Sequence, residues 1–490
     1  MAAVDLALRN ARILDGTGSA VLEGDVEVTG GRISAVGRAS GAAATVEIDA
    51  AGMLLTPGFV DVHTHDDGAL LSHPELGFKI SQGCTSLVIG NCGFSAAPAL
   101  LGATDHTKLL RTTAGWTDLA GYAAAVHDAQ PACNAMALVG HNTVRHLVLG
   151  LERREPTPAE LDRMRAHVRL AMEQGACGLS TGLIYEPGRY SQTAEIVELA
   201  RVAAEAGGLY TTHLRNEGDR LLDAVQEALH IGREAGLPVQ ISHHKAAGRQ
   251  NWGKVGASLA LMDQANAEGL DVMADVYPYT AGSGPMAQYF NLDRLDPALA
   301  EVIRFASCPA RRELEGRMCV DVAGEWGVAP VDVIRQVLTA PRGTETICIQ
   351  FLIDEADIET NLRHPLVMVG SDGIPDLNGR PHPRLFGTFP RVLGHYVRER
   401  DVLPLGEAVR RMTSLSCDRF GLVDRGRVVQ GGWADLVLLD ELTVADRATY
   451  DEPKLESTGI GLVAVNGVIS YRDGVHQPVR AGRMLRRGRS

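Results

Sequence analysis

The chain has 490 residues, of which 45% are hydrophobic and 22% charged, and its formal net charge is −13. Such an acidic chain lacks the basic surface that binds nucleic-acid backbones or anionic membranes, so we expect no nucleic acid and no membrane among its partners. The length exceeds that of one compact core and predicts a large domain with a smaller one beside it.

The cysteines and the N-terminus predict a cytoplasmic protein. The eight cysteines are dispersed and form no CxxC pair, a pattern typical of reducing compartments. Residues 1–5 show neither the basic nor the apolar segment of a secretory signal, and the sequence contains no apolar run of transmembrane length. The oligomeric state is left open.

The first fifty residues predict short β-strands. Strand-like segments at residues 6–8, 25–28 and 32–36 are separated by turns that contain glycine. We expect these strands to belong to a small β domain.

Eight apolar runs rich in β-branched residues then alternate with longer stretches of helical period. The runs cover residues 54–63, 85–91, 135–140, 177–181, 209–213, 238–243, 271–276 and 366–371. Among the helices between them, residues 158–173 follow Thr157 as N-cap and begin with Pro158. This alternation predicts an α/β fold with a (β/α)₈ barrel of the TIM type. The gap from Tyr277 to His364 is too long for one βα unit, so we expect an insertion at about residues 284–360 that overhangs the mouth as a lid.

The C-terminal end again predicts strands with tight turns. Residues 431–440 and 462–468 read as strands, and Asn466-Gly467 is a strong hairpin signal. Because chain termini often lie close together, we expect residues 1–54 and 416–490 to form one small β-sandwich domain beside a barrel of residues 55–415. The basic run at residues 483–489 is expected to be a solvated terminus.

Side chains that can bind a metal stand at the ends of five of the eight predicted barrel strands. They are His63 and His65 at the end of the first, Cys92 at the second, His213 at the fifth, His243 at the sixth and Asp372 at the eighth. In a TIM barrel these strand ends meet at one face. Imidazole, thiolate and carboxylate groups together suit Zn²⁺, whereas a histidine pair or a lone cysteine would by itself more often be structural. The set therefore predicts a zinc site.

The motifs resemble those of the N-acyl-D-amino-acid deacylases, or D-aminoacylases, of the amidohydrolase superfamily. They are PGFVDVHTH at 57–65, IGNCG at 89–93, STGLIY at 180–185, THLRNEG at 212–218, ISHHK at 241–245, YPYTAGS at 277–283, GSDG at 370–373 and RPHPRLFGTFPRVLG at 380–394. The resemblance covers nearly the whole chain. GNCG is specific, because many amidohydrolases bridge their metals with a carboxylated lysine where this family uses a cysteine.

The resemblance implies a role for each predicted ligand. One tightly bound Zn²⁺ would be held by Cys92, His213 and His243, and a second, weaker site would contain His63 and His65. Asp372 would lie near the metal and act as the catalytic acid/base, taking a proton from water and returning it to the departing nitrogen. His244 is then expected to be a packing or supporting residue, since only one of two adjacent histidines in a strand can face the metal.

The same resemblance implies that the substrate is an N-acyl-D-amino acid, hydrolysed to a carboxylic acid and a free D-amino acid. Its free carboxylate would bind Lys245, Tyr277 and Arg384, since a planar guanidinium suits bidentate carboxylate binding. Ser283 and Tyr185 are expected to line the pocket. The preference for the D enantiomer rests on the resemblance alone.

Two other functions are weighed against this one. A cyclic-amide hydrolase such as a dihydropyrimidinase or hydantoinase would use a carboxylated lysine at the fourth strand, and residues 177–181 contain no lysine. A non-catalytic scaffold on the same fold would typically have lost its ligands, and here the sequence retains them. We therefore expect a metal-dependent hydrolase of linear amide bonds.

Overall fold

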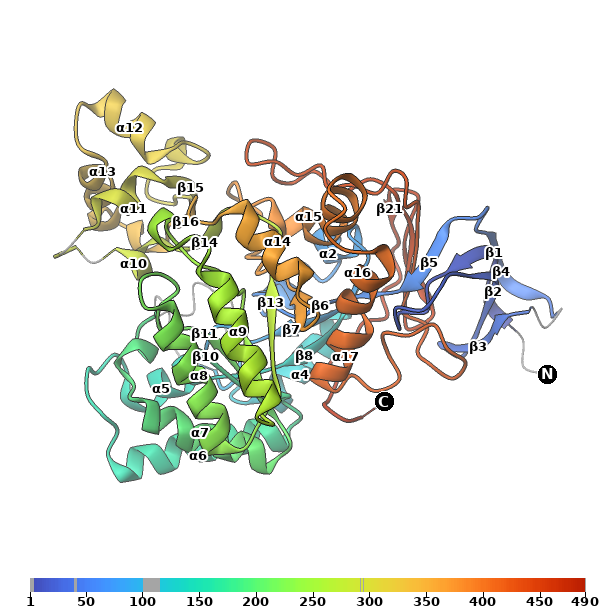
Figure 1. The fold of residues 1–490 in the computed structure, drawn as a ribbon, viewed down its shortest axis with the longest axis horizontal. Helices are drawn as coiled ribbons and strands as arrows, with labels where there is room; N and C mark the ends of the chain where they lie inside the picture. Colours follow the sequence, from blue (N-terminus) through green and yellow to red (C-terminus); the bar gives the residue numbers. More distant parts are fainter. Residues whose placement is uncertain (1–3, 39–41, 100–114, 291, 294, 490) are drawn as a thin grey trace.

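The computed structural model describes residues 4–38, 42–99, 115–290, 292–293 and 295–489. Its elements fall into a sheet made from both ends of the chain, a set of parallel strands with helices around them, and a small antiparallel sheet between residues 282 and 350 (Figure 1). The fold is α/β with mixed sheets.

Both ends of the chain pair in one nine-stranded sheet, in the order β21-β20-β19-β18-β5-β1-β2-β3 with β4 beside β1. Its strands are β1 (Val4–Ile13), β2 (Leu22–Thr29), β3 (Arg32–Gly37), β4 (Ala44–Asp49), β5 (Leu54–Pro57), β18 (Leu436–Leu439), β19 (Ile460–Val465), β20 (Val468–Arg472) and β21 (Val475–His476). The antiparallel pairing of β18 with β5 joins the C-terminal strands to the N-terminal ones. Leu8, Val26, Leu436 and Leu462 belong to one buried apolar cluster, so residues from both ends share a core.

The middle of the chain forms two parallel sheets, β6-β7-β8 and β17-β13-β12-β11-β10-β9. Their strands are β6 (Phe59–Asp61), β7 (Cys84–Ile89), β8 (Asn134–Ala137), β9 (Val139–Gly140), β10 (Gly178–Gly182), β11 (Leu209–His213), β12 (Val239–Ile241), β13 (Val272–Val276) and β17 (Val367–Val369). Thr64, after β6, forms a parallel bridge with Gly373, after β17. The first and last strands of this set are therefore neighbours at their carboxyl ends.

The predicted strand at residues 54–63 is wrong as a single element. Leu54–Pro57 pairs in the terminal sheet as β5, whereas Phe59–Asp61 pairs with β7 as β6. The chain changes sheets at Gly58, where a Cβ atom would lie only 2.2 Å from the Thr85 hydroxyl oxygen. A continuous apolar run does not reveal which sheet each of its residues joins.

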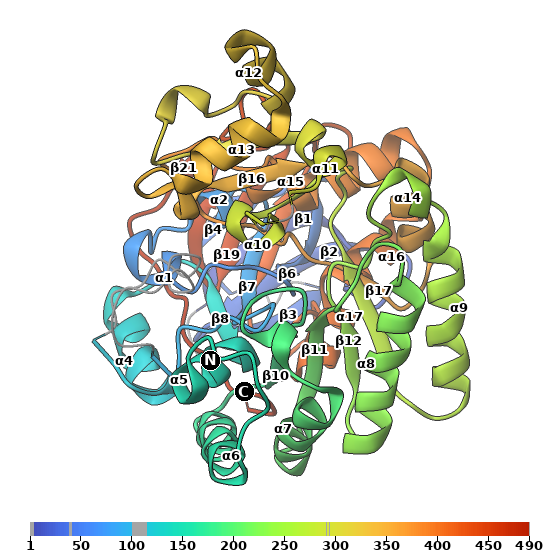
Figure 2. The ribbon, with the colours of Figure 1, turned by 90° about the vertical axis from the view of Figure 1, so that its left-hand side faces the viewer.

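Helices surround the parallel strands, and Figure 2 shows α4 to α9 arranged around them. They are α1 (Ala69–Ser72), α2 (Gly77–Ile80), α4 (Leu119–Ala129), α5 (His141–Leu149), α6 (Pro158–Glu173), α7 (Thr193–Glu205), α8 (Leu221–Ala235), α9 (Lys254–Ala267), α14 (Glu355–Arg363), α15 (Arg384–Arg391), α16 (Leu405–Met412) and α17 (Ser414–Phe420), with a π-helix at Val392–Glu399. Helix α6 begins and ends as predicted, and at its start Thr157 and Glu160 cap each other's backbone N–H groups. In the described part of the chain, no helix is long and apolar enough to cross a membrane.

The segment between β13 and α14 forms a structure with its own core. It contains β14 (Gly282–Pro285), α10 (Met286–Tyr289), α11 (Pro297–Glu301), β15 (Ile303–Ser307), α12 (Cys319–Trp326), α13 (Pro330–Thr339) and β16 (Ile347–Gln350). Phe305, Val322 and Ile334 are buried in a separate apolar cluster there. This segment lies at one end of the molecule (Figure 1). Its first and last strands reach the cavity described below.

The basic C-terminal segment is bound to the protein, and the expectation of a solvated terminus is wrong. Its backbone hydrogen bonds run from Gly482 N–H to Pro131 O at 2.9 Å, from Ala135 N–H to Arg483 O at 2.9 Å, from Leu485 N–H to Ala135 O at 2.7 Å and from Gly488 N–H to Gly421 O at 2.9 Å. The C-terminal segment therefore pairs with strand β8 near the first residue of that strand.

Deleting residues 482–490 is expected to lower the thermal unfolding midpoint by about 2 to 5 °C, because each lost hydrogen bond contributes about 1 kcal/mol. Differential scanning calorimetry measures the change. Deleting only Arg489 and Ser490 keeps these bonds and should leave the midpoint in place. An unchanged midpoint in the longer deletion would show that the segment does not stabilise the fold.

Candidate metal centre

The six predicted ligand residues come together at the carboxyl ends of the parallel strands. Their ligand atoms form two overlapping groups, one of His63, His65, Cys92 and Asp372 and the other of Cys92, His213 and His243. Within each group all ligand atoms lie within 4.8 Å of one another, and all six residues are buried. The two groups share Cys92.

The thiol of Cys92 lies at the centre of the histidines. Its Sγ atom is 3.3 Å from His63 Nε2, 3.5 Å from His243 Nε2 and 3.8 Å from His213 Nδ1. Two ligands at typical zinc distances and a tetrahedral angle lie about 3.5 Å apart. The donor atoms and their spacing therefore fit a zinc ion.

Three of these residues adopt a left-handed backbone conformation that residues other than glycine rarely take. The φ angles are 54° for Cys92, 36° for His243 and 50° for Asp372. Hydrogen bonds hold two of them, from Asp372 N–H to His63 O at 2.7 Å and from His243 N–H to Asp275 Oδ1 at 2.8 Å. Such strain concentrates at functional sites, where the surrounding structure enforces it.

The expectation that only one of the adjacent His243 and His244 faces the cluster is confirmed, but alternation along a strand is not the reason. Strand β6 ends at Asp61 and strand β12 at Ile241, so His63, His65 and His243 lie in the turns that follow. The turns still bring the rings of His63 and His65 to 5.7 Å between centroids. The neighbouring His244 points elsewhere, with Nδ1 2.7 Å from Asn361 Oδ1 and Nε2 2.7 Å from Ser258 Oγ.

The charges of the site favour the ionised forms of the thiol and the carboxylate. Burial raises the pKa of the Cys92 thiol, but the charges of His63 and His243 outweigh it and hold this pKa well below its usual range. Burial likewise opposes ionisation of Asp372, and Arg384, with Nη1 3.0 Å from Asp372 Oδ2, holds the pKa of that carboxyl well below its usual range. Both groups therefore present the charge state that a metal ligand needs.

The sequence did not predict two carboxylates behind these histidines, the buried Asp275 and the partly exposed Glu217. Asp275 Oδ1 is 3.2 Å from His63 Nδ1, and Glu217 Oε1 is 3.0 Å from His243 Nδ1. The available signals were a charged residue inside the apolar strand β13 and a glutamate four residues after His213. Neither signal says which histidine the carboxylate contacts.

A small cavity of about 40 Å³ lies beside the cluster. Lys245, Tyr277, Ser283 and Tyr185 line it, together with His213, His243 and Asp372 and with Tyr289, Gln350, Leu352 and Ile353 from the segment after β13. Arg384 is not among the lining residues. Its guanidinium stacks over the Tyr277 ring at 4.5 Å and donates to the Ser283 carbonyl oxygen at 3.2 Å.

The cations beside the cavity already have carboxylate partners. Lys245 Nζ is 2.5 Å from Glu217 Oε1, and Arg384 is paired with Asp372. The Tyr277 hydroxyl is buried next to the Arg384 guanidinium, which can only donate to it, so the hydroxyl proton has no acceptor in the described part of the chain. Within the described residues it is thus a free donor near the cluster.

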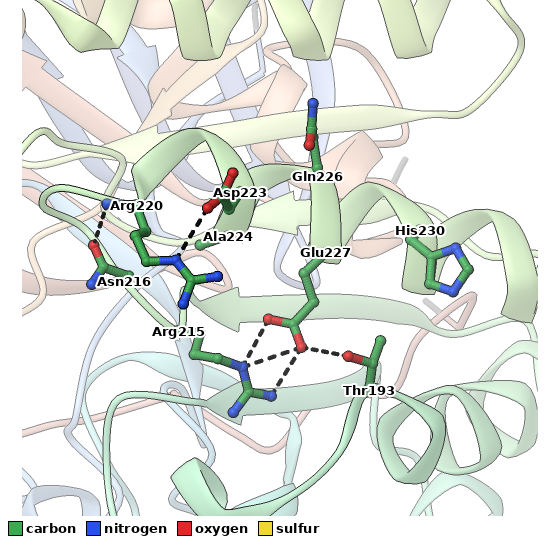
Figure 3. Close-up of a pocket in the computed structure, with 9 residues that line it drawn as sticks. All are labelled: Thr193, Arg215, Asn216, Arg220, Asp223, Ala224, Gln226, Glu227 and His230. Atoms are coloured by element: carbon green, nitrogen blue, oxygen red, sulfur yellow. Dashed lines mark hydrogen bonds and ion pairs between the residues drawn. The ribbon is translucent and has the colours of Figure 1, made fainter.

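A larger groove of about 640 Å³ lies elsewhere, at the start of α8 (Figure 3). Its arginines are neutralised locally, since Arg215 pairs with Glu227 at 2.9 Å and Arg220 with Asp223 at 3.1 Å. None of the six ligand residues lines this groove. The chemistry of the site therefore belongs to the smaller cavity.

Comparison with known proteins agrees with the motifs. A model of the amidohydrolase family matches residues 46–309 and 287–471. An N-acyl-D-glutamate deacylase of Alcaligenes xylosoxydans xylosoxydans is 42% identical over 99% of this chain and 97% of its own length.

Two solved structures each cover 99% of this chain and 100% of their own, with a TM-score of 0.92 and 42% identity. One is an N-acyl-D-glutamate deacylase from Bordetella bronchiseptica, complexed with zinc and a phosphonate inhibitor that mimics the tetrahedral intermediate. The other is a D-aminoacylase with a binuclear metal centre, characterised by one-metal activation and second-metal attenuation. The chain therefore belongs to the amidohydrolase family and, within it, to the group of D-aminoacylases and N-acyl-D-amino-acid deacylases that its motifs indicated.

Proposed function

We propose that this protein is a zinc-dependent hydrolase that cleaves the amide bond of N-acyl-D-amino acids and releases a carboxylic acid and a free D-amino acid. The observation that carries the proposal is the buried cluster of Cys92, His213 and His243 with Asp372 beside the same cavity. Full-length relatives that are named as deacylases of this substrate class support it.

Cys92, His213 and His243 would hold the tight zinc, and His63 and His65 a second, weaker one beside Asp372. Zinc in such a site polarises a carbonyl group and lowers the pKa of water. Asp372 then accepts a proton from the attacking water. As the C–N bond breaks, it delivers that proton to the departing nitrogen.

Lys245, Tyr277 and Arg384 would bind the substrate carboxylate, with Ser283 and Tyr185 in the pocket wall. Tyr277 supports this assignment, because its buried hydroxyl proton has no acceptor among the described residues and its ring lies against the Arg384 guanidinium. Since Arg384 also pairs with Asp372, the substrate carboxylate competes with Asp372 for it. Binding of substrate thus frees the catalytic carboxylate.

Replacing Arg384 by alanine is expected to lower kcat/KM at least about tenfold, because a charge-assisted hydrogen bond contributes about 1.5 to 3 kcal/mol. Amidation of the substrate carboxylate should cause a similar loss in the wild type and little further loss in the variant. The kcat/KM values of the wild type and the variant, each with the acid and the amide substrate, give the coupling energy between Arg384 and the substrate carboxylate. If the two losses multiply in full, Arg384 does not bind the carboxylate.

Arg391 provides a matched control for that experiment. It is on the same helix and also stacks on a tyrosine, Tyr279, at 4.9 Å, yet it pairs with Asp446 and not with Asp372. Arg391→Ala should leave the discrimination between acid and amide substrates unchanged.

The function itself is tested with a panel of N-acetyl-D-amino acids and their L enantiomers, using N-acetyl-D-methionine first. We expect hydrolysis of D substrates that stops when zinc is chelated and returns when zinc is restored. Hydrolysis of hydantoins or dihydropyrimidines would instead favour the cyclic-amide alternative. Strand β10, residues 178–182, offers no lysine for the carboxylated ligand of that class. A zinc-loaded protein inactive on every substrate would favour a scaffold.

We also propose that the parallel strands form one (β/α)₈ barrel of the TIM type. In support, only Leu138 separates β8 from β9, and the Thr64–Gly373 bridge links the ends of β6 and β17. The predicted barrel of residues 55–415, with its insertion at about 284–360, would then begin after β5 rather than at residue 55, because Leu54–Pro57 pairs in the terminal sheet. Residues 1–54 and 416–490 would be the small β-sandwich domain.

A further inference from the structure

The outward nitrogen of His243 has two competing neighbours. His243 Nδ1 lies 3.0 Å from Glu217 Oε1 and 2.7 Å from Lys245 Nζ. A carboxylate can only accept a proton from this nitrogen, whereas an ammonium group can only donate one to it. The two neighbours therefore demand opposite tautomers of the imidazole.

The tautomer decides whether His243 can bind a metal. The opposite nitrogen, Nε2, faces Cys92 Sγ at 3.5 Å, so it is the nitrogen that would bind a metal shared with Cys92. If Nδ1 carries the proton, Nε2 is free to bind zinc. If Lys245 donates to Nδ1, the proton of the neutral ring must lie on Nε2, and the ligand is lost.

We propose that Glu217 is a positioning residue that fixes the metal-binding tautomer of His243 by accepting its Nδ1 proton and by holding Lys245. Glu217 reaches both groups, since its Oε1 atom is also 2.5 Å from Lys245 Nζ. Its Oε2 atom faces His213 Nε2 at 3.6 Å, on the side of that ring away from Cys92. One carboxylate thus lies behind both histidines of the three-residue group.

This inference rests on the zinc site of the proposed function, and its test needs no substrate. Zinc affinity is measured by competition with a chromogenic chelator in Glu217→Gln, Lys245→Met and the double variant. We expect Glu217→Gln to raise the zinc Kd about 10- to 100-fold, as is typical when the partner of a ligating histidine is changed. Glutamine keeps the size of the side chain but has one acceptor oxygen in place of two. That oxygen would have to accept from both Lys245 Nζ and His243 Nδ1.

The double variant distinguishes tautomer control from a general structural role. Without Lys245 no ammonium competes for His243 Nδ1, and the glutamine carbonyl can accept its proton, so we expect most of the zinc affinity to return. Additive losses in the double variant would overturn the proposal. Lys245→Met alone should bind zinc at least as tightly as the wild type, and weaker binding there would also contradict it, even if Glu217→Gln failed to fold.

Glu195 offers a matched control. It is buried and contacts a histidine, His141, at 2.8 Å, but His141 is outside both ligand groups. Glu195→Gln should leave zinc affinity unchanged. If it lost as much zinc affinity as Glu217→Gln, the loss would come from replacing any carboxylate in the interior and not from control of the His243 tautomer. If the zinc pattern holds while the wild type hydrolyses no N-acyl-D-amino acid, the proposed function fails and the role of Glu217 stands.

Discussion

Replacing Asp372 by asparagine is expected to lower kcat for N-acetyl-D-methionine by about 10²- to 10⁴-fold, the usual contribution of a general acid/base. Asparagine has nearly the same shape but cannot take a proton from water and return it to the leaving nitrogen. Because Asp372 is not in the group of Cys92, His213 and His243, the tight zinc should remain. Steady-state kinetics and zinc analysis of the same preparation measure both effects.

Asp376 serves as the control for this variant. It is a buried aspartate four residues further along the chain and belongs to neither ligand group. Asp376→Asn should keep kcat near the wild-type value. Wild-type turnover in Asp372→Asn would refute the acid/base assignment.

Replacing Cys92 by alanine is expected to remove the tight zinc and the activity together. Cys92 is the one residue shared by both ligand groups, and its Sγ atom lies within 3.8 Å of three imidazole nitrogens. Loss of a ligand should weaken zinc binding by more than the about 10- to 100-fold typical of residues behind the ligands. Atomic absorption after dialysis, with enzyme assays before and after zinc addition, measures it.

Buried cysteines outside the cluster provide the comparison. Cys133 and Cys348 are fully buried, and burial raises the pKa of both thiols, so they remain protonated and are poor metal ligands. Alanine at either position should leave the zinc content at the wild-type level. Full zinc occupancy in Cys92→Ala would disprove the ligand assignment.

The sequence alone determined the elements whose signals are local. Thr157 and Pro158 marked the start of α6, and the run at residues 209–213 is strand β11 to the residue. The six proposed ligand residues, which the structure brings together, were also named from the sequence, because each lies at or just after the end of a strand and strand ends meet at one edge of a parallel sheet. Their side chains are types that can bind a metal, whatever the exact conformation of the turns that hold them.

The tertiary structure alone decided which groups surround those ligands. No local pattern places Glu217 behind His243, or Arg384 against Asp372, since each pair is brought together by packing of segments far apart in the sequence or by a turn. The left-handed backbone at Cys92 and His243 likewise costs energy that local propensity opposes and the surrounding structure supplies. For the same reason the change of sheet at Gly58 and the pairing of the C-terminal segment with β8 were not predicted, because pairing depends on contacts between distant residues.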